Sequence, residues 1–213
     1  EFQGGKSDIT VRQLMTHFSG MRPDLTLTPE WSGYETGIQK ALIDKPVAEP
    51  GERMIYSDIN FELLGEIVHR VSGVPLDEYA RKEIFLPLGM KESMFNPPAS
   101  WRPRIAPTEM WKVKVLRGVV HDPTARFMGG VAGHAGLFTT AMDLSRFATF
   151  LLNLGELDGT RLVSPLSVRK FTEPQTPPLQ TTMRGLGWDI DSPFSGNRGE
   201  LFPIGSYGHT GFT

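Results

Sequence analysis

Two short segments carry side chains that are suited to acyl-transfer chemistry. Tyr56-Ser57-Asp58 stands at the start of a helical pattern, and His209-Thr210-Gly211 stands near the end of the sequence. A phenol that lies beside a helix N-terminus and near a cation has its phenolate form favoured, so Tyr56 is a candidate general base. A histidine next to a hydroxyl can polarise that phenol or bind a carboxylate. Together the two segments predict a hydrolase site from which the nucleophile is missing.

The elements around Tyr56 follow from the flanking sequence. Pro50-Gly51-Glu52-Arg53 is a turn signal, and the residues after Tyr56 have the 3.6-residue spacing of a helix over 58–71, ended by Gly73. Ser57 or Asp58 is expected to accept hydrogen bonds from the first-turn amides. The apolar positions that define this helix are Ile59, Leu63, Leu64, Ile67, Val68 and Val71.

The second segment lies in a glycine-rich stretch, residues 206–212, which is expected to form a strand whose backbone approaches a ligand closely. A further glycine-rich loop, residues 129–136, contains His134 and lacks the lysine and hydroxyl of a phosphate-binding loop. His17 and His69 are read as packing or surface residues.

Four collinear segments resemble the penicilloyl-serine transferase superfamily, which contains class C beta-lactamases, D-Ala-D-Ala carboxypeptidases and related esterases. Residues 9–20 resemble its T-V-R-D-L-L-T-H-T-S-G segment, and residues 50–65 resemble P-G-x-x-x-x-Y-S-N-x-x-x-x-L-L-G. Residues 133–144 resemble A-G-G-L-x-S-T-A-x-D-L, and residues 206–212 resemble the histidine or lysine motif of the family.

The resemblance implies an acyl-serine mechanism in which the serine and lysine of an S-x-x-K segment attack an amide or ester carbonyl. It implies that Tyr56 is the general base and leaving-group acid, and that Asp58 orients the lysine or the substrate. The remaining implied contacts are His209 and Thr210 for a carboxylate or the transition state, Gly211 and Phe212 for an oxyanion, and His134 for substrate.

The S-x-x-K segment itself is not found where the family has it, before the tyrosine motif. The formal match Ser167-Val168-Arg169-Lys170 comes after Tyr56 and reads as a surface helix entered through Pro165. We therefore expect the chain to be a piece of a longer protein, without the first strands, the nucleophile helix and the last strands.

Two departures from the family pattern bear on specificity. Asp58 replaces the usual asparagine, and an ionised carboxylate can only accept hydrogen bonds. His209 replaces a lysine, which removes a permanent positive charge from the place where beta-lactams and D-Ala-D-Ala peptides put their carboxylate. Both changes favour an esterase or a peptidase of modified specificity over efficient beta-lactam hydrolysis.

The expected fold class is α/β (α+β), a beta-lactamase/transpeptidase-like fold seen mostly as its helical subdomain plus part of the antiparallel sheet. Residues 1–213 are expected to form a single partial domain. Pro75 is expected to begin a helix of its own, and residues 96–122 to be loosely structured. The other expected helices are 10–17, 31–43 and 142–154, and strands are expected at 185–190 and 206–212.

Composition excludes several partners. The net charge of −2, with no basic run, gives no basis for nucleic-acid binding. The chain contains no cysteine, which excludes disulfides and thiolate catalysis, and no apolar run is long enough to span a bilayer. The expected partners are a small-molecule or peptide substrate and the remainder of the chain's own fold, with no cofactor and no metal. The resemblance alone implies a periplasmic or extracytoplasmic location.

Two rival functions remain open. The chain could be a non-catalytic binding or regulatory module that kept the fold and lost the chemistry. Alternatively, His121, Asp122 and His134 could form a metallohydrolase site, although their spacing matches no zinc motif.

Overall fold

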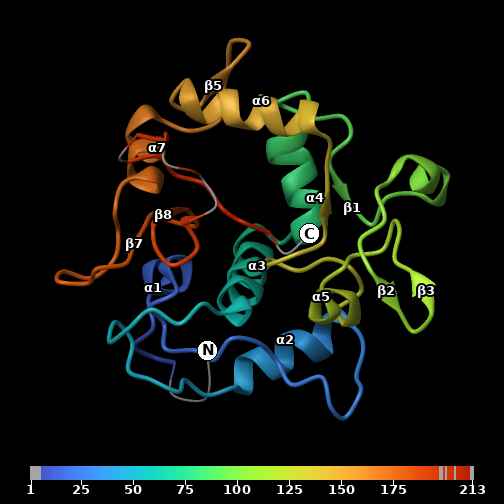
Figure 1. Ribbon diagram of the computed structural model, residues 1–213, viewed down its shortest axis with the longest axis horizontal. Coiled ribbons are helices and arrows are strands. Elements are labelled where there is room, and N and C mark those ends of the chain that lie inside the picture. The colour runs from blue at the N-terminus through green and yellow to red at the C-terminus, as the bar shows by residue number, and fades with distance from the viewer. Residues whose placement is uncertain (1–5, 197–198, 200, 204, 212–213) are drawn as a thin grey trace.

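The structure is a computed structural model that describes residues 6–196, 199, 201–203 and 205–211 (Figure 1). Helices and short antiparallel strands are mixed along the chain. The α-helices are α1 Val11–Thr16, α2 Tyr34–Ile43, α3 Asp58–Ser72, α4 Leu76–Ala80, α5 Pro123–Phe127, α6 Ala141–Leu152 and α7 Pro165–Thr172. A π-helical turn, Arg81–Phe85, continues α4, and a 3-10 helix covers Ala99–Arg104. None of the helices in the described part of the chain has both the length and the apolar character needed to cross a membrane.

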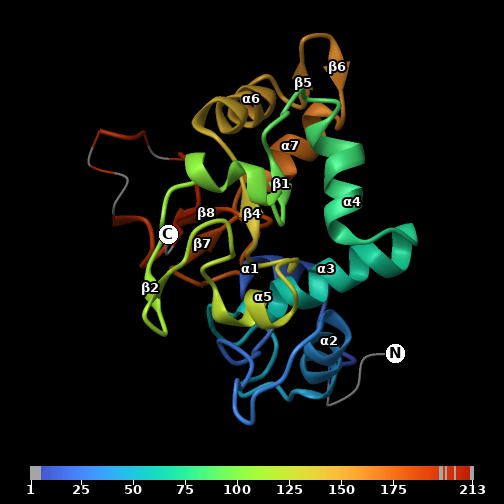
Figure 2. The same ribbon diagram turned by 90° about the vertical axis from the view of Figure 1, so that its right-hand side faces the viewer.

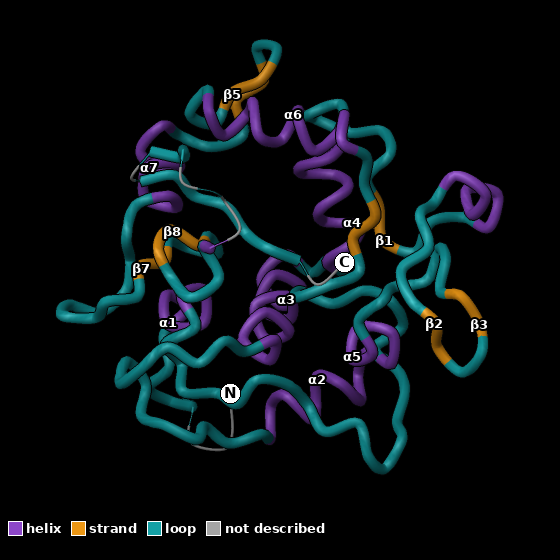
Figure 3. Tube along the Cα trace, in the orientation of Figure 1, coloured by secondary structure: helices purple, strands orange, loops and turns teal. Residues whose placement is uncertain are grey.

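The strands are short and pair in four antiparallel ribbons, β1-β4, β2-β3, β5-β6 and β7-β8. The strands are β1 Met94–Phe95, β2 Met110–Trp111, β3 Lys114–Val115, β4 Leu137–Phe138, β5 Glu156–Leu157, β6 Thr160–Arg161, β7 Met183–Arg184 and β8 Asp189–Asp191. The β1-β4 pair joins segments that are far apart in the sequence. Figure 3, coloured by secondary structure, shows that long loops connect the helices and the short strands.

The prediction of a strand over residues 206–212 was wrong about its length. Among the described residues of this segment the structure has one isolated antiparallel bridge, between Asp189 and Gly208. The bridge is closed by reciprocal backbone hydrogen bonds of 2.8 and 3.0 Å. It is enough to fix the segment beside β8, and the expected end of the strand at Phe212 lies outside the described residues.

One hydrophobic core joins the helices α1, α2, α3 and α5, which lie together in the lower part of Figures 1 and 2. Its buried side chains include Leu14, Ile38, Ile59, Leu63, Ala125 and Met128. The apolar stripe predicted for α3 supplies two of these residues and directs that face of the helix into the core.

A second hydrophobic core joins α4, α6, α7 and β5 in the upper part of the same views. Its buried side chains include Ala80, Phe85, Leu88, Phe150, Leu157 and Val168. Trp188 and Tyr207 pack against this core from the C-terminal segment. The segment that carries His209 is therefore anchored by side-chain packing as well as by its backbone bridge.

The start of α3 differs from the sequence expectation. Ser57 precedes the helix but its hydroxyl does not cap it; the hydroxyl donates instead to the carbonyl of Arg22, at 2.6 Å. The Ser57 amide donates to Nδ1 of His17, at 3.1 Å. These two bonds tie the tyrosine motif to the segment after α1. The helix ends as predicted, at Gly73, whose φ of 71° is left-handed.

The loop that carries His134 crosses α3 with its backbone in contact with the helix. A Cβ atom at Gly133 would lie 1.8 Å from the carbonyl oxygen of Phe61 and 3.2 Å from the amide nitrogen of Gly65. Only glycine allows two backbones to approach this closely. The glycine-rich sequence is thus required for the close crossing of the loop over the helix.

Other expectations hold in part. Helix α7 begins at Pro165 with Ser164 as its N-cap, which confirms the reading of this segment as a helix. Helix α2 begins three positions later than expected because Gly33, with φ of 97°, holds the preceding turn. The segment 96–122 contains the 3-10 helix and the β2-β3 hairpin, which its prolines concealed.

Candidate functional site

A cleft of about 1150 Å³ brings the two motifs together. Every predicted site residue that the structure describes lines this cleft: Tyr56, Asp58, His134, His209, Thr210 and Gly211. Phe212 lies outside the described residues. The walls also include Trp101, Arg104, Thr108 and Phe194.

Tyr56 and His209 face each other across the cleft. The phenol oxygen of Tyr56 lies 3.4 Å from Nε2 of His209. Nδ1 of His209 lies 2.7 Å from the carbonyl oxygen of Thr210, which can only accept, so Nδ1 carries the proton. Loss of hydration in the cleft lowers the pKa of His209. A neutral His209 therefore turns an unprotonated Nε2 towards the Tyr56 hydroxyl.

His17 lies behind Tyr56, with the two rings stacked at 4.1 Å between centroids. Nδ1 of His17 accepts the Ser57 amide and faces the side-chain amide of Asn60 at 3.3 Å, which places the ring proton on Nε2. Burial, reinforced by the charge of Arg184, lowers the pKa of His17 to about 3. His17 is thus a neutral, buried residue that packs against the tyrosine, which agrees with its reading as a packing residue.

Arg184 and Asp189 form a buried pair on β7 and β8. Their side chains are 0% and 3% exposed, and Nη1 of Arg184 lies 3.4 Å from Oδ1 of Asp189. The guanidinium carbon of Arg184 lies 5.9 Å from the centre of the Tyr56 ring. Nothing in the sequence around either residue marks it as part of the site, because the pair is made by the β7-β8 ribbon.

The surroundings of Tyr56 do not favour the phenolate in the way that the sequence suggested. Burial first, and the charge of Asp58 second, raise the pKa of Tyr56, and Arg184 opposes them. The helix start therefore brings a carboxylate as well as a positive dipole end close to the phenol. Base catalysis by Tyr56 requires positive charge to outweigh both effects.

A cluster of carboxylates lies on the other side of the α3 start. Nε2 of His134 donates to Oδ1 of Asp122 at 2.9 Å, and Asp122 also caps α5 by accepting the Ala125 amide at 2.6 Å. Burial disfavours the Asp122 carboxylate, but the hydrogen bond and charge of His134, together with the backbone amides of Ala125 and Thr124, outweigh burial and lower the pKa of Asp122. Burial would discharge His134, yet the contact with Asp122 raises its pKa. Asp122 therefore favours the protonated form of His134.

Glu62 lies beneath this cluster and was not anticipated from the sequence. Its side chain is 0% exposed, and Oε1 lies 3.8 Å from Nδ1 of His134. Neither carboxylate oxygen has a hydrogen-bond partner among the described residues. Burial raises the pKa of Glu62 to about 8, against the opposing charge of His134. At neutral pH the Glu62 side chain is therefore mostly protonated.

Asp58 stands between this cluster and the open cleft. Burial raises its pKa to about 6, with His134 opposing the shift. Its carboxylate belongs with Asp122 and His134 to a group whose potential ligand atoms all lie within 4.8 Å of one another. Among the described residues, these three form the one group whose ligand atoms lie close enough together to hold a metal ion. A metal ion there would have to displace the proton that His134 shares with Asp122.

The metal trio suggested by the sequence is not assembled as expected. His121 lines the cleft, but its Nε2 pairs with Glu109 at 3.2 Å instead of joining Asp122 and His134. Asp58 takes its place in the cluster. The sequence reading missed this because Asp58 and Asp122 are brought together by the packing of α5 on the α3 side of the core.

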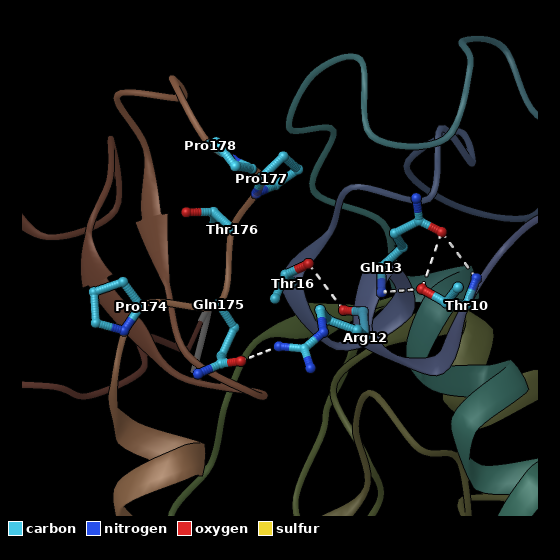
Figure 4. Close-up of a pocket in the computed structure, with 9 residues that line it drawn as sticks. All are labelled: Thr10, Arg12, Gln13, Thr16, Pro174, Gln175, Thr176, Pro177 and Pro178. Carbon is cyan, nitrogen blue, oxygen red and sulfur yellow. Dashed lines mark hydrogen bonds between the residues drawn. The ribbon is translucent and has the colours of Figure 1, made fainter.

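The formal S-x-x-K match is excluded from the site by its position. Ser167 lies on α7, where its hydroxyl contacts that of Ser164 at 3.0 Å, and it does not line the cleft. A separate cleft lies between α1 and the segment 174–178, where Arg12 bonds the side chain of Gln175 (Figure 4). Its lining residues are threonines, prolines, glutamines and one arginine, and therefore offer no carboxylate, histidine or tyrosine for acid-base chemistry.

Curated relatives match nearly the whole chain. This chain is 31% identical, over an alignment of 234 positions, to a "Putative D-alanyl-D-alanine carboxypeptidase" of Salmonella heidelberg (strain SL476). The alignment covers 98% of this chain and 54% of the relative. A protein of the same description from Escherichia coli (strain K12) is 32% identical, with 98% of this chain and 53% of the relative covered. The chain thus spans about half the length of the curated relatives it matches.

Solved structures show the fold. A penicillin-binding protein homologue from Caulobacter crescentus superposes with a TM-score of 0.72 at 23% identity, over 98% of this chain and 61% of that one. A beta-lactamase/D-alanine carboxypeptidase from Pseudomonas syringae gives 0.66 at 20% identity, over 88% and 49%. The chain therefore has the beta-lactamase/transpeptidase-like fold, as the sequence predicted. The family model described as Beta-lactamase matches residues 1–213, so the chain belongs to the beta-lactamase family.

Proposed function

We propose that this chain supplies the larger part of the active site of a serine hydrolase. The enzyme cleaves an amide or ester through an acyl-serine intermediate. The observation that carries the proposal is the approach of the Tyr56 hydroxyl to Nε2 of His209, at 3.4 Å, in the cleft that also contains Asp58, Thr210 and His134. Family membership supports the reaction class. The relatives described as carboxypeptidases support a hydrolase of this superfamily.

In the first half-reaction Tyr56, as phenolate, removes the proton of the serine hydroxyl while the serine oxygen bonds to the substrate carbonyl carbon. The carbonyl oxygen takes up the electron pair, and the backbone around Gly211 supplies one amide that stabilises it. When the carbonyl re-forms, the bond to the leaving nitrogen or oxygen breaks. Tyr56 gives its proton to that leaving group, so that the phenolate is restored and the acyl-serine ester remains.

In the second half-reaction water takes the place of the leaving group. Tyr56 removes a proton from the water as its oxygen bonds to the acyl carbon, and the serine oxygen leaves with that proton. The products are the carboxylic acid and the free enzyme. Neutral His209 accepts a hydrogen bond from the Tyr56 hydroxyl in the intervals when the phenol is protonated.

The nucleophile is assigned to a segment outside this chain. The residues lining the described cleft include Thr108, Thr139, Thr140 and Thr210 but no serine. The nearby Ser57 hydroxyl is buried and donates to the carbonyl of Arg22. We assign residues 1–213 to a single partial domain that is completed by a preceding S-x-x-K segment. The lysine of that segment would pair with Asp58, which offers the free carboxylate nearest to Tyr56 in the sequence.

The proposed substrate is an acyl ester or a peptide in preference to a beta-lactam. A neutral His209 supplies no permanent charge for a substrate carboxylate, and Asp58 when ionised repels one. The preference is tested by comparing turnover of a cephalosporin with that of short acyl esters. Faster cephalosporin turnover would contradict it.

The reaction class is tested with the full-length protein that contains this chain. Intact mass is measured before and after exposure to a fluorophosphonate and a penicillin. We expect a covalent adduct that maps outside residues 1–213, and a rate of labelling at least tenfold lower for Tyr56→Phe. Tyr79→Phe, which removes the hydroxyl of a half-buried tyrosine on α4, is the matched control and should label at the normal rate.

The alternative is a non-catalytic binding module with the same fold. The absence of a serine among the described cleft-lining residues is compatible with it. Folded full-length protein that forms no adduct with either probe would favour this alternative and overturn the hydrolase.

A further inference from the structure

Arg184 is the most deeply buried cation in the described part of the chain and is poorly neutralised. It is 0% exposed, and its Nε and Nη2 atoms have no hydrogen-bond partner among the described residues. Its ion pair with Asp189 is long, at 3.4 Å. A guanidinium has five N–H donors and normally uses several of them when it is buried. Arg184 therefore retains positive charge and donor capacity that its own neighbourhood does not satisfy.

Asp189 is itself shared among other donors, which limits how far it neutralises Arg184. Oδ2 of Asp189 accepts the hydroxyl of Ser195 at 2.8 Å, and Oδ1 accepts the hydroxyl of Ser192. The carboxylate is thus held by a turn of its own segment and does not make the two parallel bonds of a bidentate pair. The excess positive field of Arg184 reaches the group beside it, which is the ring of Tyr56 at 5.9 Å.

We infer that Arg184 is a positioning residue of the proposed site, buried behind Tyr56 to stabilise its phenolate form. This inference rests on the proposed role of Tyr56 as general base. A cation near a phenol ring is attracted more strongly when the ring carries a negative charge, because the charge of a phenolate spreads into the ring. Arg184 therefore distinguishes between the two protonation states of Tyr56 without touching the substrate.

The charged groups that face Tyr56 come from every element packed against it. Asp58 from α3 and Asp189 from β8 raise the pKa of Tyr56, after burial. His17, which is stacked on the ring, is neutral, and His209 across the cleft has a lowered pKa. Of these described groups Arg184 is the one permanent cation, and it is the one that lowers the pKa of Tyr56.

The expected size of the effect follows from the separation. With an effective dielectric constant of about 20, a unit charge at this distance shifts a pKa by roughly one to two units. The direction distinguishes this role from simple packing, because looser packing would admit water and lower the pKa of Tyr56, whereas loss of the cation raises it.

The test measures the ionisation of Tyr56 directly in the full-length protein labelled with ¹³C at the tyrosine ring carbon that bears oxygen. The Tyr56 resonance is assigned by its loss in Tyr56→Phe. In Arg184→Met we expect the Tyr56 titration, and the acidic limb of kcat/KM for p-nitrophenyl acetate, to move up by roughly one to two pH units. Arg184→Lys keeps the positive charge, so the Tyr56 titration in this variant should stay close to its wild-type pH. Arg126→Met is the matched control, because Arg126 also has a buried Nε without a partner but does not face Tyr56.

Asp189→Asn supplies the opposite perturbation and keeps the test valid if Arg184→Met does not fold. Removing the negative charge of Asp189 should lower the Tyr56 titration, whereas loss of Arg184 should raise it. A structural role would not produce opposed shifts from the two halves of one ion pair. If Tyr56 titrates at the wild-type pH in folded Arg184→Met, or, where that variant does not fold, in Asp189→Asn, the inference is overturned.

The two proposals fail in different ways. Full activity of Tyr56→Phe would remove the proposed function, and the resonance of Tyr56 would still report whether Arg184 controls its ionisation. Loss of activity in Tyr56→Phe with no response of Tyr56 to Arg184 would leave the proposed function standing and remove the positioning role.

Discussion

The start of α3 separates two buried polar regions of opposite character. Behind Tyr56 lie Arg184 and His17, where buried donors outnumber acceptors. Beyond Asp58 lie Glu62 and the Asp122–His134 pair, where carboxylates predominate. Both regions contain buried polar atoms without partners among the described residues, but in the first they are donors and in the second they include the oxygens of Glu62.

The two histidines show what this difference does. The pKa of His17 falls to about 3, because burial and then Arg184 disfavour its cation. The pKa of His134 rises, because contacts with Asp122 and Glu62 outweigh burial. The pKa values of two imidazoles at the same helix start are therefore shifted in opposite directions, that of His17 downwards and that of His134 upwards. The surroundings, and not the residue type, decide the charge on each side of the site.

The largest expected effect comes from removing the imidazole of the carboxylate region. His134→Gln takes the protonatable partner away from Asp122 and Asp58, and we expect a loss of about 3 kcal/mol in the free energy of unfolding at pH 7. Urea denaturation of the full-length protein measures it. His69→Gln, which removes a partly exposed histidine near Glu66 on α3, should cost less than about 1 kcal/mol. Equal losses in the two variants would contradict the description of His134 as the partner of these carboxylates.

The next effect concerns acid stability on the Arg184 side. Because the folded pKa of His17 is about 3 and its ordinary value is 6.5, the unfolded chain binds a proton between these pH values that the folded chain does not. This contribution to stability is fully present above pH 6.5 and is lost as the pH falls towards 3. His17→Asn removes it, and asparagine tolerates the left-handed φ of 61° at this position.

We therefore expect the stability difference between wild type and His17→Asn to shrink by about 2 kcal/mol when the pH is lowered from 7 to 5. Chemical denaturation at the two pH values measures it. A difference that stays constant with pH would show that His17 binds a proton in the folded protein.

A smaller effect of opposite sign is expected from Glu62. Its folded pKa of about 8 exceeds its ordinary value of 4.5, so the folded chain binds the extra proton and stability declines as the pH rises from 4.5 through 8. Glu62→Gln keeps the shape and removes this decline. We expect the variant to gain about 1 kcal/mol relative to wild type between pH 7 and pH 8. Parallel pH profiles of the unfolding free energy would count against a buried, protonated Glu62.

The smallest expected effect sharpens the boundary between the two regions. Asp58 has a pKa of about 6 and is proposed to pair with the incoming lysine only when it is ionised. Asp58→Asn should remove a kinetic ionisation near pH 6 and reduce kcat/KM at pH 7 by a few fold, which is less than about 1.4 kcal/mol in activation free energy. Ester hydrolysis as a function of pH measures both. An ionisation near pH 6 that persists in the variant would have to be assigned elsewhere.

Sequence patterns predicted the parts of the molecule that depend on local periodicity and on motif order. The apolar spacing after Tyr56 and the glycine at position 73 gave the extent of α3 to within one residue. The collinear motifs predicted that Tyr56 and His209 meet, although most of the chain separates them. These features could be predicted because a helix period and a C-cap depend on neighbouring residues, and the order of motifs is read directly from the sequence.

The charged groups behind the site could not be predicted in this way. Arg184 becomes part of the site only because the β7-β8 ribbon buries it against Tyr56, and Glu62 looked like an ordinary polar position on a helix. The expected cap from Ser57 was wrong because a tertiary partner, the carbonyl of Arg22, competed for its hydroxyl. Burial of a polar side chain is a property of the assembled fold, so local spacing carries no signal for it.

The crossing of Gly133 over α3 limits how the cleft can adapt. Because the loop backbone rests on the carbonyl of Phe61, a displacement of His134 towards the helix is blocked, and the wall formed by Asp58 and His134 has a fixed shape. Room for a bulkier acyl group must then come from other parts of the lining, such as the segment that contains Trp101, Ile105 and Thr108. Differences in substrate size among close relatives are therefore expected to follow sequence changes in that segment, while the wall containing the acid-base groups stays constant.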